Sequence, residues 1–199
     1  MIPAVVALHF EKVDPQLYQA SLSLKPSLVL QPRTDYFAAL CESIVGQQIS
    51  TKAGDAIWGR FCTLFPDKKV TVEKAVTLQV EMLRGIGVSN SKARYILDLA
   101  TKVANLEIDL EQLPGQTDEE IMKELTLVKG IGPWTVEMFL MFTLGREDIF
   151  STRDLGLKRA IQKLYDMTYE PSMQELEEIS LPWSPYRTYA SMILWRTLS

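Results

Sequence analysis

Asp154 is the residue whose type and position best suit it for chemistry. It lies in the polar segment 151–154 (STRD), at the start of a predicted helix. The positive end of a helix dipole favours a negative charge, and an ionised carboxylate can orient a water molecule or stabilise a developing positive charge. The alternative is that Asp154 only caps the helix. The neighbouring basic residues, which could face phosphate, are Arg153, Lys158, Arg159 and Lys163.

The composition narrows the chemistry that this chain could perform. Its 199 residues are 47% hydrophobic and 23% charged, as in ordinary globular proteins. His9 is the one histidine, which argues against Ser-His-Asp and Cys-His mechanisms and against histidine-rich metal sites. Cys41 and Cys62 lack the paired spacing of a zinc site or a disulfide framework, so we expect two reduced core thiols. The reactive groups must therefore be carboxylates, hydroxyls, lysines or aromatic rings.

A glycine-containing segment, 127–135 (LVKGIGPWT), joins two stretches with helical spacing. Gly130 and Gly132 permit positive φ angles and close approach of another backbone, and Pro133 suits the first turn of a helix. N–H groups at such a helix start can bind a phosphate without lysines. This answers the objection that a net charge of −4 and a pI near 5.2 raise against a nucleic-acid partner. A plain helix C-cap is the alternative.

A similar segment, 83–87 (LRGIG), precedes 128–132 (VKGIG) at a spacing of 45 residues. Helical repeats of the HEAT class have units of about 40–47 residues. The remainder of the two units aligns poorly, however. Two separate helical hairpins therefore fit the sequence better than a repeat array.

Hydrophobic spacing is helical almost throughout, so we predict an all-α protein with one short strand at 5–10. The predicted helix starts are Thr34, Ser50 or Thr51, Ser89 or Ser91, and Thr117 with Glu120 as a capping box. The later helices are predicted at 133–144, 152–165, 171–179 and 186–198. This order places the glycine segment and Asp154 at successive helix starts.

Three further segments carry distinctive patterns: 43–53 (SIVGQQISTKA), 83–96 (LRGIGVSNSKARYI) and 183–190 (WSPYRTYA). Together with the glycine segment and Asp154, they resemble the motifs of the helix-hairpin-helix DNA glycosylase superfamily (HhH-GPD), in the same order. The resemblance extends from about Asp35 to Trp195. It implies an all-α, two-lobed fold with the active-site cleft between the lobes.

The resemblance also implies how the chain is divided. Residues 1–34 would form an N-terminal segment that packs on the core. Residues 35–130 would form a helical lobe that carries a DNA wedge in its QQIS loop. Residues 117–165 would hold the helix-hairpin-helix and the catalytic aspartate, and residues 166–199 would form C-terminal helices that close the second lobe.

Trp134 and the cysteine count indicate the branch of the superfamily. Members that also cut the DNA strand carry a Schiff-base lysine where this chain has Trp134, so no β-lyase activity is expected. Iron–sulfur members need four cysteines near the C-terminus, and this chain has two in all. Trp134 and the segment 183–190 resemble the 3-methyladenine DNA glycosylase II branch (AlkA and yeast Mag type), in a compact form because few residues precede the match.

The branch implies roles for individual residues, with Asp154 as the catalytic carboxylate. A cationic base stacked on an aromatic face gains about 0.5–2 kcal/mol. The candidate base-pocket residues are Trp134, Trp195, Met138 and Tyr189, and core packing is the alternative role for the aromatic ones. The candidate residues for the DNA backbone are Lys129, Gly130, Ile131, Gly132 and Thr135.

The wedge that fills the gap left by a flipped base would be Gln48. Gln47 is the second candidate. Its alternative role is to form hydrogen bonds with buried backbone groups. No cofactor is required, but the hairpin could hold a Na⁺ or K⁺ ion through the backbone carbonyls of Thr126, Val128 and Ile131.

The implied function is that of a monofunctional DNA glycosylase, which excises alkylated purines such as 3-methyladenine and 7-methylguanine from duplex DNA by base flipping, in base excision repair. An alkylated purine is already cationic and leaves without a protonating acid, so the lack of a catalytic histidine is no obstacle. The alternatives are a glycosylase for deaminated or mismatched bases, a non-catalytic helix-hairpin-helix module that binds DNA, and a helical scaffold for protein interactions.

The expected partner is double-stranded DNA that contains alkylated bases. We expect the protein to act as a monomer and not to associate with a membrane. The apolar run 2–8 has neither a basic start nor a small-residue cleavage site. We therefore expect the protein in the cytoplasm or nucleoid, or in the nucleus if it is eukaryotic.

Overall fold

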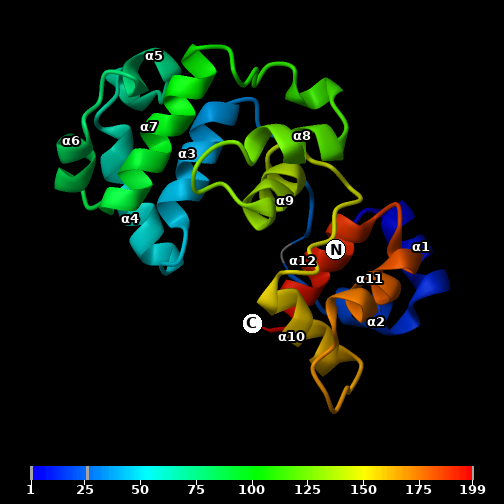
Figure 1. The fold of residues 1–199 in the computed structure, drawn as a ribbon. Coiled ribbons are helices and arrows are strands. Elements are labelled where there is room, and N and C mark those ends of the chain that lie inside the picture. Colours follow the sequence, from blue (N-terminus) through cyan, green and yellow to red (C-terminus); the bar gives the residue numbers. More distant parts are fainter. Residues whose placement is uncertain (1, 26, 199) are drawn as a thin grey trace. The chain divides into compact units, whose positions relative to one another are not determined.

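The computed structural model describes residues 2–25 and 27–198, and these residues contain helices but no strand (Figure 1). The all-α prediction is therefore confirmed. The α-helices are α1 (Ala4–Val13), α2 (Pro15–Leu22), α3 (Tyr36–Gly46), α4 (Thr51–Cys62), α5 (Val72–Ala75), α6 (Val80–Gly85), α7 (Asn90–Ala104), α8 (Asp118–Leu125), α9 (Pro133–Phe142), α10 (Leu155–Leu164), α11 (Met173–Ser180) and α12 (Arg187–Arg196). Short 3₁₀ turns are η1 (Pro66–Lys68), η2 (Leu113–Gly115) and η3 (Leu181–Trp183).

The chain divides into two compact units. Unit 1 consists of Met1–Pro32 and Leu140–Ser199, and unit 2 consists of Arg33–Phe139. The range 117–165, which the sequence groups as one segment, is thus divided between the units within α9. The glycine segment belongs to unit 2 and Asp154 belongs to unit 1.

Unit 1 is built from α1, α2, α10, α11 and α12 around a core that includes Phe10, Leu17 and Trp183. Asp14 joins its N-terminal and C-terminal parts. It caps α2 by accepting the Leu17 N–H (2.9 Å), and its other carboxylate oxygen accepts the indole N–H of Trp183 (2.7 Å). The N-terminal helices are therefore an integral part of this unit.

The predicted strand at 5–10 is wrong, because these residues lie in α1. Val6 and Phe10 are its buried residues, and a spacing of four places them on one face of a helix. The segment 5–10 is short enough to suit either structure. Packing of α1 on α2 and η3 selects the helix.

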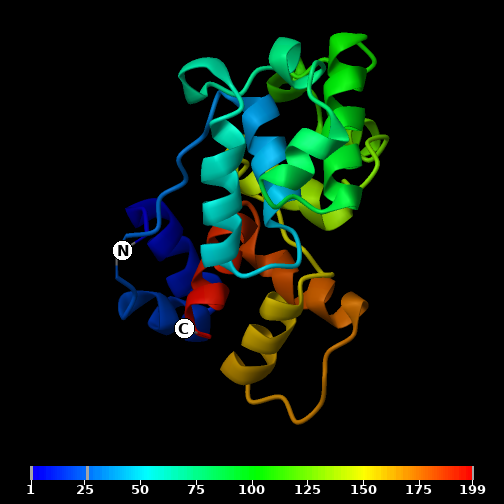
Figure 2. The ribbon, with the colours of Figure 1, turned by 90° about the vertical axis from the view of Figure 1, so that its left-hand side faces the viewer.

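Unit 2 has α3 and α7 side by side, as both views show (Figure 1, Figure 2). Its helix starts follow the predicted cap chemistry. Ser50 caps α4, Ser89 caps α7, and Thr117 forms a capping box with Glu120 on α8. Polar side chains thus satisfy the first N–H groups of the helices that position the site.

Four predicted helix starts are displaced by one to three residues. The helix α3 begins at Tyr36 with Asp35, not Thr34, in the N-cap position, and the Asp35 carboxylate binds the Arg33 guanidinium (2.8 Å) instead of capping the helix. The helix α10 begins at Leu155, after the predicted start at 152, because Asp154 is its cap. The helix α11 begins at Met173, not 171, because Ser172 is its cap, and α12 begins at Arg187, not 186.

Candidate functional site

The glycine hairpin (residues 126–132) joins α8 to α9 in unit 2. Gly130 has a φ of +85°, and a Cβ atom at this position would lie 2.0 Å from Cδ2 of Tyr95. A side chain there would therefore meet both backbone strain and a steric clash. Gly132 has neither constraint, since its φ is not positive and nothing lies within 4 Å of an added Cβ. Of the two glycines, only Gly130 meets the predicted need for a positive φ.

Hydrogen bonds hold the turn of the hairpin. The Lys129 N–H donates to Oδ2 of Asp98 (2.9 Å), and the Ile131 N–H donates to the Val128 carbonyl (3.1 Å). Lys129 and Gly130 are exposed, whereas Val128 and Ile131 are buried. The first turn of a helix presents N–H groups that lack intrahelical acceptors, so the exposed turn and the start of α9 together can bind a phosphate.

The wedge loop (residues 47–50) connects α3 to α4. Gln48 is exposed and has a φ of +55°, which is unusual for a residue other than glycine. The Gln47 side chain donates its amide N–H to the Gly130 carbonyl (2.9 Å) and lies 3.4 Å from the Thr135 hydroxyl. Gln47 thus binds a backbone carbonyl, although that of an exposed residue, and of the two glutamines Gln48 is the exposed one.

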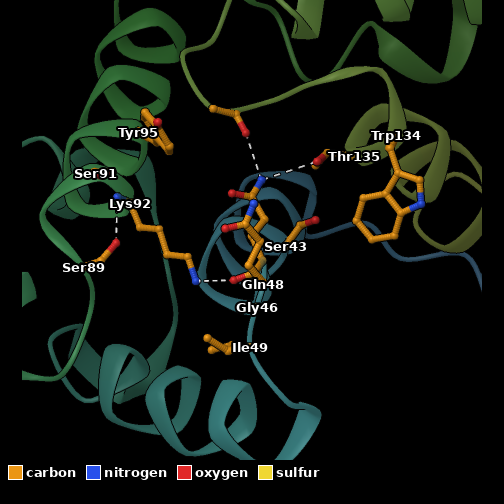
Figure 3. Close-up of a pocket in the computed structure, with 12 residues that line it drawn as sticks. Ser43, Gly46, Gln48, Ile49, Ser89, Ser91, Lys92, Tyr95, Trp134 and Thr135 are labelled. Atoms are coloured by element: carbon orange, nitrogen blue, oxygen red, sulfur yellow. Dashed lines mark hydrogen bonds between the residues drawn. The ribbon is translucent and has the colours of Figure 1, made fainter. Parts of the chain in front are cut away.

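A cavity of about 850 Å³ lies between the wedge loop, α7 and the start of α9. Lys92 and Trp134 lie on opposite sides of the wedge-loop side chains (Figure 3). Trp134 is 41% exposed, so its ring is available for contact. Tyr95 lines the cavity as well, whereas Met138, one turn further along α9, is not among its lining residues.

Three side chains of α7 contact the wedge loop or the hairpin, and the sequence predicted no role for them. Lys92 donates to the carbonyls of Val45 (2.8 Å) and Gln47 (2.6 Å). Partial burial lowers the pKa of Lys92. Lys92, Tyr95 and Asp98 follow at intervals of three, which places them along one side of the helix. This spacing could have indicated that the three side chains share one helix face. The sequence does not indicate which residues they contact.

In unit 1, Asp154 caps α10. Its Oδ1 atom accepts the Leu157 N–H (2.7 Å) and the indole N–H of Trp195 (2.9 Å). Gly156 packs closely against both side chains. A Cβ atom added to it would lie 3.0 Å from Oδ1 of Asp154 and 3.1 Å from Nε1 of Trp195. The carboxylate is therefore oriented by two donors and by the close packing of a glycine.

The aromatic residues of unit 1 differ in their surroundings. Trp195 is partly buried, and its ring centroid lies 5.9 Å from that of Phe142, a residue not predicted from the sequence. Tyr189 is only 4% exposed and packs in the core of the unit. Its burial favours the packing role over contact with a ligand.

The basic residues near Asp154 are partly engaged within unit 1. The Lys158 ammonium lies 2.8 Å from the Glu170 carboxylate, and that of Lys163 donates to the Thr197 carbonyl (2.7 Å). Arg159 and Arg153 are exposed. The lysines therefore have structural partners in addition to any role with phosphate.

The segment 183–190 supports the chain that leads to Asp154. The Arg187 guanidinium donates to Oδ1 of Asp148 (2.8 Å), and the Ser184 hydroxyl donates to Oδ2 (2.8 Å). Thr188 accepts the Ile149 N–H (3.0 Å). Burial acts to raise the pKa of Asp148, but the hydrogen bonds from Arg187 and Ser184 outweigh it and hold that pKa below its usual value.

The cysteines, expected to be core thiols, and the hairpin carbonyls, the candidate ligands of a Na⁺ or K⁺ ion, complete the list of predicted residues. Cys41 is buried, which raises the pKa of its thiol, and Cys62 is half-buried. Within residues 2–25 and 27–198, no group of three or more His, Cys, Asp and Glu side chains could hold a metal ion. The Val128 carbonyl accepts the Ile131 N–H (3.1 Å), and a carbonyl oxygen has two lone pairs.

Comparison with known proteins identifies the family. The model of the HhH-GPD superfamily of base excision DNA repair proteins matches residues 41–185. The chain belongs to this superfamily. A DNA-3-methyladenine glycosylase of Saccharomyces cerevisiae is 32% identical, and the match covers 96% of this chain and 78% of that protein. Two relatives from Bacillus subtilis are 35% and 33% identical, and this chain spans 60% and 57% of their lengths.

Solved structures agree with this assignment. The 3-methyladenine DNA glycosylase Mag1 of Schizosaccharomyces pombe, in complex with abasic DNA, superposes with a TM-score of 0.86 at 26% identity, over 98% of this chain and 96% of that one. A DNA-3-methyladenine glycosidase of Bacillus halodurans gives a TM-score of 0.84 at 34% identity, over 98% and 89%. None of the helices that the structure describes has the length and apolar character needed to span a membrane.

Proposed function

We propose that this protein is a monofunctional DNA glycosylase that hydrolyses the N-glycosidic bond of alkylated purines in duplex DNA. The observation that carries the proposal is the Asp154 carboxylate, which two donors, the Leu157 N–H and the Trp195 indole, hold at the start of α10. Membership of the superfamily and the names of its relatives supply the reaction class. The reaction belongs to base excision repair.

Asp154 is the proposed catalytic residue. Cleavage of the glycosidic bond passes through an oxocarbenium-like transition state, in which positive charge develops on the sugar. A carboxylate near that sugar stabilises the charge directly, or orients the water molecule that attacks it. A 3- or 7-alkylated purine is cationic and departs as a neutral base, so no general acid is required.

Trp134 and Trp195 are the proposed aromatic contacts of the damaged base. Both rings are at least partly exposed within their own units. A cationic purine gains about 0.5–2 kcal/mol from an aromatic face, so it is preferred over a neutral base. Met138, one turn beyond Trp134 on α9, is a further proposed contact of the base within unit 2. Tyr189 is left out of the proposed contacts because it is buried in the core of unit 1.

The glycine hairpin is the proposed site for the DNA backbone, through Lys129, Gly130, Ile131, Gly132 and Thr135. The side chains of Ile131 and Thr135 are buried, so the contacts proposed for them are made by their backbone. A Na⁺ or K⁺ ion held by the carbonyls of Thr126, Val128 and Ile131 would neutralise part of the phosphate charge. Thr126 follows the C-terminus of α8, where the helix dipole favours a cation. Gln48 is the proposed wedge that enters the duplex when the base is flipped.

The absence of strand cleavage is part of the proposal. Trp134 carries no amine, so it cannot form the Schiff base that a β-lyase needs. The product is then an abasic site in an intact strand. We further propose that the protein acts as a monomer on duplex DNA, in the cytoplasm or nucleoid, or in the nucleus of a eukaryote, and needs no iron–sulfur cluster.

The test is the fate of methylated duplex DNA. The wild-type protein is incubated with DNA that contains N-methylated purines, and the released bases are identified by chromatography. We expect free 3-methyladenine or 7-methylguanine, with strand breaks that appear only after alkali. Breaks without alkali would contradict the monofunctional mechanism. Binding of DNA without release of any base would indicate a non-catalytic module instead.

A further inference from the structure

One side of α7 holds both loops that are proposed to contact DNA. Lys92 binds the wedge loop, Tyr95 packs on Gly130, and Asp98 accepts the Lys129 N–H (2.9 Å). All of these contacts lie within unit 2. The segment that contains Lys92 and Tyr95, 83–96, stood out in the sequence but has no part in the proposed chemistry.

Lys92 makes the contact that bears on the wedge. Its ammonium donates to the Val45 carbonyl (2.8 Å) in the last turn of α3 and to the Gln47 carbonyl (2.6 Å). Gln47 lies beyond the helix and directly precedes Gln48. Lys92 is half-buried and lines the cavity beside the wedge loop (Figure 3). The ammonium therefore fixes the peptide unit from which the wedge projects.

The conformation of Gln48 needs such a restraint. A φ of +55° is disfavoured for a residue with a side chain, and it persists only where the surroundings hold it. A second hydrogen bond restrains the loop, because the Gln47 side chain donates to the Gly130 carbonyl (2.9 Å). The wedge loop is thus linked to α7 on one side and to the hairpin on the other.

We propose that Lys92 is a positioning residue that holds the wedge loop in the conformation able to enter DNA, in fixed register with the phosphate-binding hairpin. The inference rests on the proposed function. Lys92 does not touch the reacting atoms. Its loss should slow base flipping and excision while leaving the hairpin, and hence general affinity for DNA, nearly intact.

A simpler role is that Lys92 only caps the C-terminus of α3, as lysines commonly do. In that case the loss of Lys92 would lower thermal stability, and the variant molecules that remain folded would excise the base at the wild-type rate. The two roles differ in what they predict for a folded variant. They also differ in whether a free amine restores activity.

The experiment compares Lys92→Met and Lys92→Arg with Lys69→Met. Lys69 is exposed and lies in the same unit, so its variant matches the loss of charge without the loss of the loop contacts. Single-turnover excision, affinity for undamaged duplex and backbone hydrogen exchange at residues 46–50 are measured for each. We expect Lys92→Met to excise at least about tenfold more slowly, the loss that one charge-assisted hydrogen bond predicts. Its affinity for undamaged DNA should remain near that of the wild type.

Three further results are expected. Hydrogen exchange at residues 46–50 should be faster in Lys92→Met, and Lys92→Arg should recover part of the excision rate. In a fourth variant, Lys92→Ala, added propylamine, which replaces the atoms lost, should partly restore excision. Equal rates for Lys92→Met and Lys69→Met, with unchanged exchange, would overturn the inference. A uniform loss of stability without rescue would support the simple capping role.

The design separates this inference from the proposed function. If the wild-type protein released no base, the proposed function would fail, and the role in excision would fail with it. Exchange at residues 46–50 would still show whether Lys92 holds the loop. If the wild type is active and the Lys92 variants match it, only the inference fails.

Discussion

Trp195 donates its indole N–H to Oδ1 of Asp154 at 2.9 Å, across 41 residues of sequence. The same oxygen accepts the Leu157 N–H at 2.7 Å, so one carboxylate oxygen serves as a helix cap and as the acceptor for an aromatic side chain. Capping and catalysis are therefore compatible at Asp154. The cap orients the carboxylate, and Trp195 couples that orientation to a ring proposed to touch the base.

Replacement of Trp195 by phenylalanine tests this coupling. Trp195→Phe keeps an aromatic face but removes the N–H that donates to Asp154. A hydrogen bond to a charged group contributes about 1.5–3 kcal/mol, so excision should slow by roughly tenfold to a hundredfold. Single-turnover rates and DNA affinity would be measured together. A wild-type rate in Trp195→Phe would show that the hydrogen bond does not support catalysis.

Gly156→Ala should separate activity from stability. The added Cβ would lie 3.0 Å from Oδ1 of Asp154 and 3.1 Å from Nε1 of Trp195, so one of them must shift. Gly156 is the second residue of α10, so alanine gains at most the roughly 1 kcal/mol by which it is preferred over glycine inside a helix, and this gain offsets part of the crowding. We expect excision to fall by about tenfold with little change in the free energy of unfolding. Unchanged excision would mean that the carboxylate tolerates displacement.

Gly130→Ala should damage the hairpin much more than Gly132→Ala. The left-handed backbone costs about 1–2 kcal/mol for alanine, and the clash with Tyr95 adds about 1–3 kcal/mol. Gly132 has open space around it and serves as the control for stability. Urea denaturation of both variants measures the difference. Similar free energies of unfolding would contradict the role given to the positive φ of Gly130.

The ion pair of Asp148 predicts a dependence of stability on pH. The folded state holds the pKa of Asp148 below its usual value, so its contribution is present above the unfolded pKa, near 3.9. It is lost as the pH falls through the folded pKa. Asp148→Asn should be less stable by about 1 kcal/mol at neutral pH, since the pair is partly exposed, and should lose less stability in acid. An equal acid dependence in both proteins would exclude this role.

Local chemistry made parts of the fold predictable from sequence. Ser50, Ser89 and Thr117 cap the helices that follow them because capping depends on residues within one turn. The segment at 5–10 was misassigned because its buried residues, Val6 and Phe10, suit either a strand or a helix until their packing partners are known.

The candidate site was predictable only in part. The cap at Asp154 and the positive φ of Gly130 followed from short motifs, since each depends on residues nearby in sequence. The contact between Trp195 and Asp154, and that between Lys92 and the Gln47 carbonyl, join segments 41 and 45 residues apart. Such pairs depend on how helices pack, which a single sequence does not specify.

The most direct test of the central claim is excision of a methylated purine by Asp154→Asn and by the wild type under single-turnover conditions. Asparagine keeps the shape of the side chain and can still cap α10, so the fold should survive. We expect the wild type to release the base, and Asp154→Asn to bind the same DNA with similar affinity but release essentially none. Release by Asp154→Asn at the wild-type rate would contradict the assignment of Asp154 as the catalytic carboxylate.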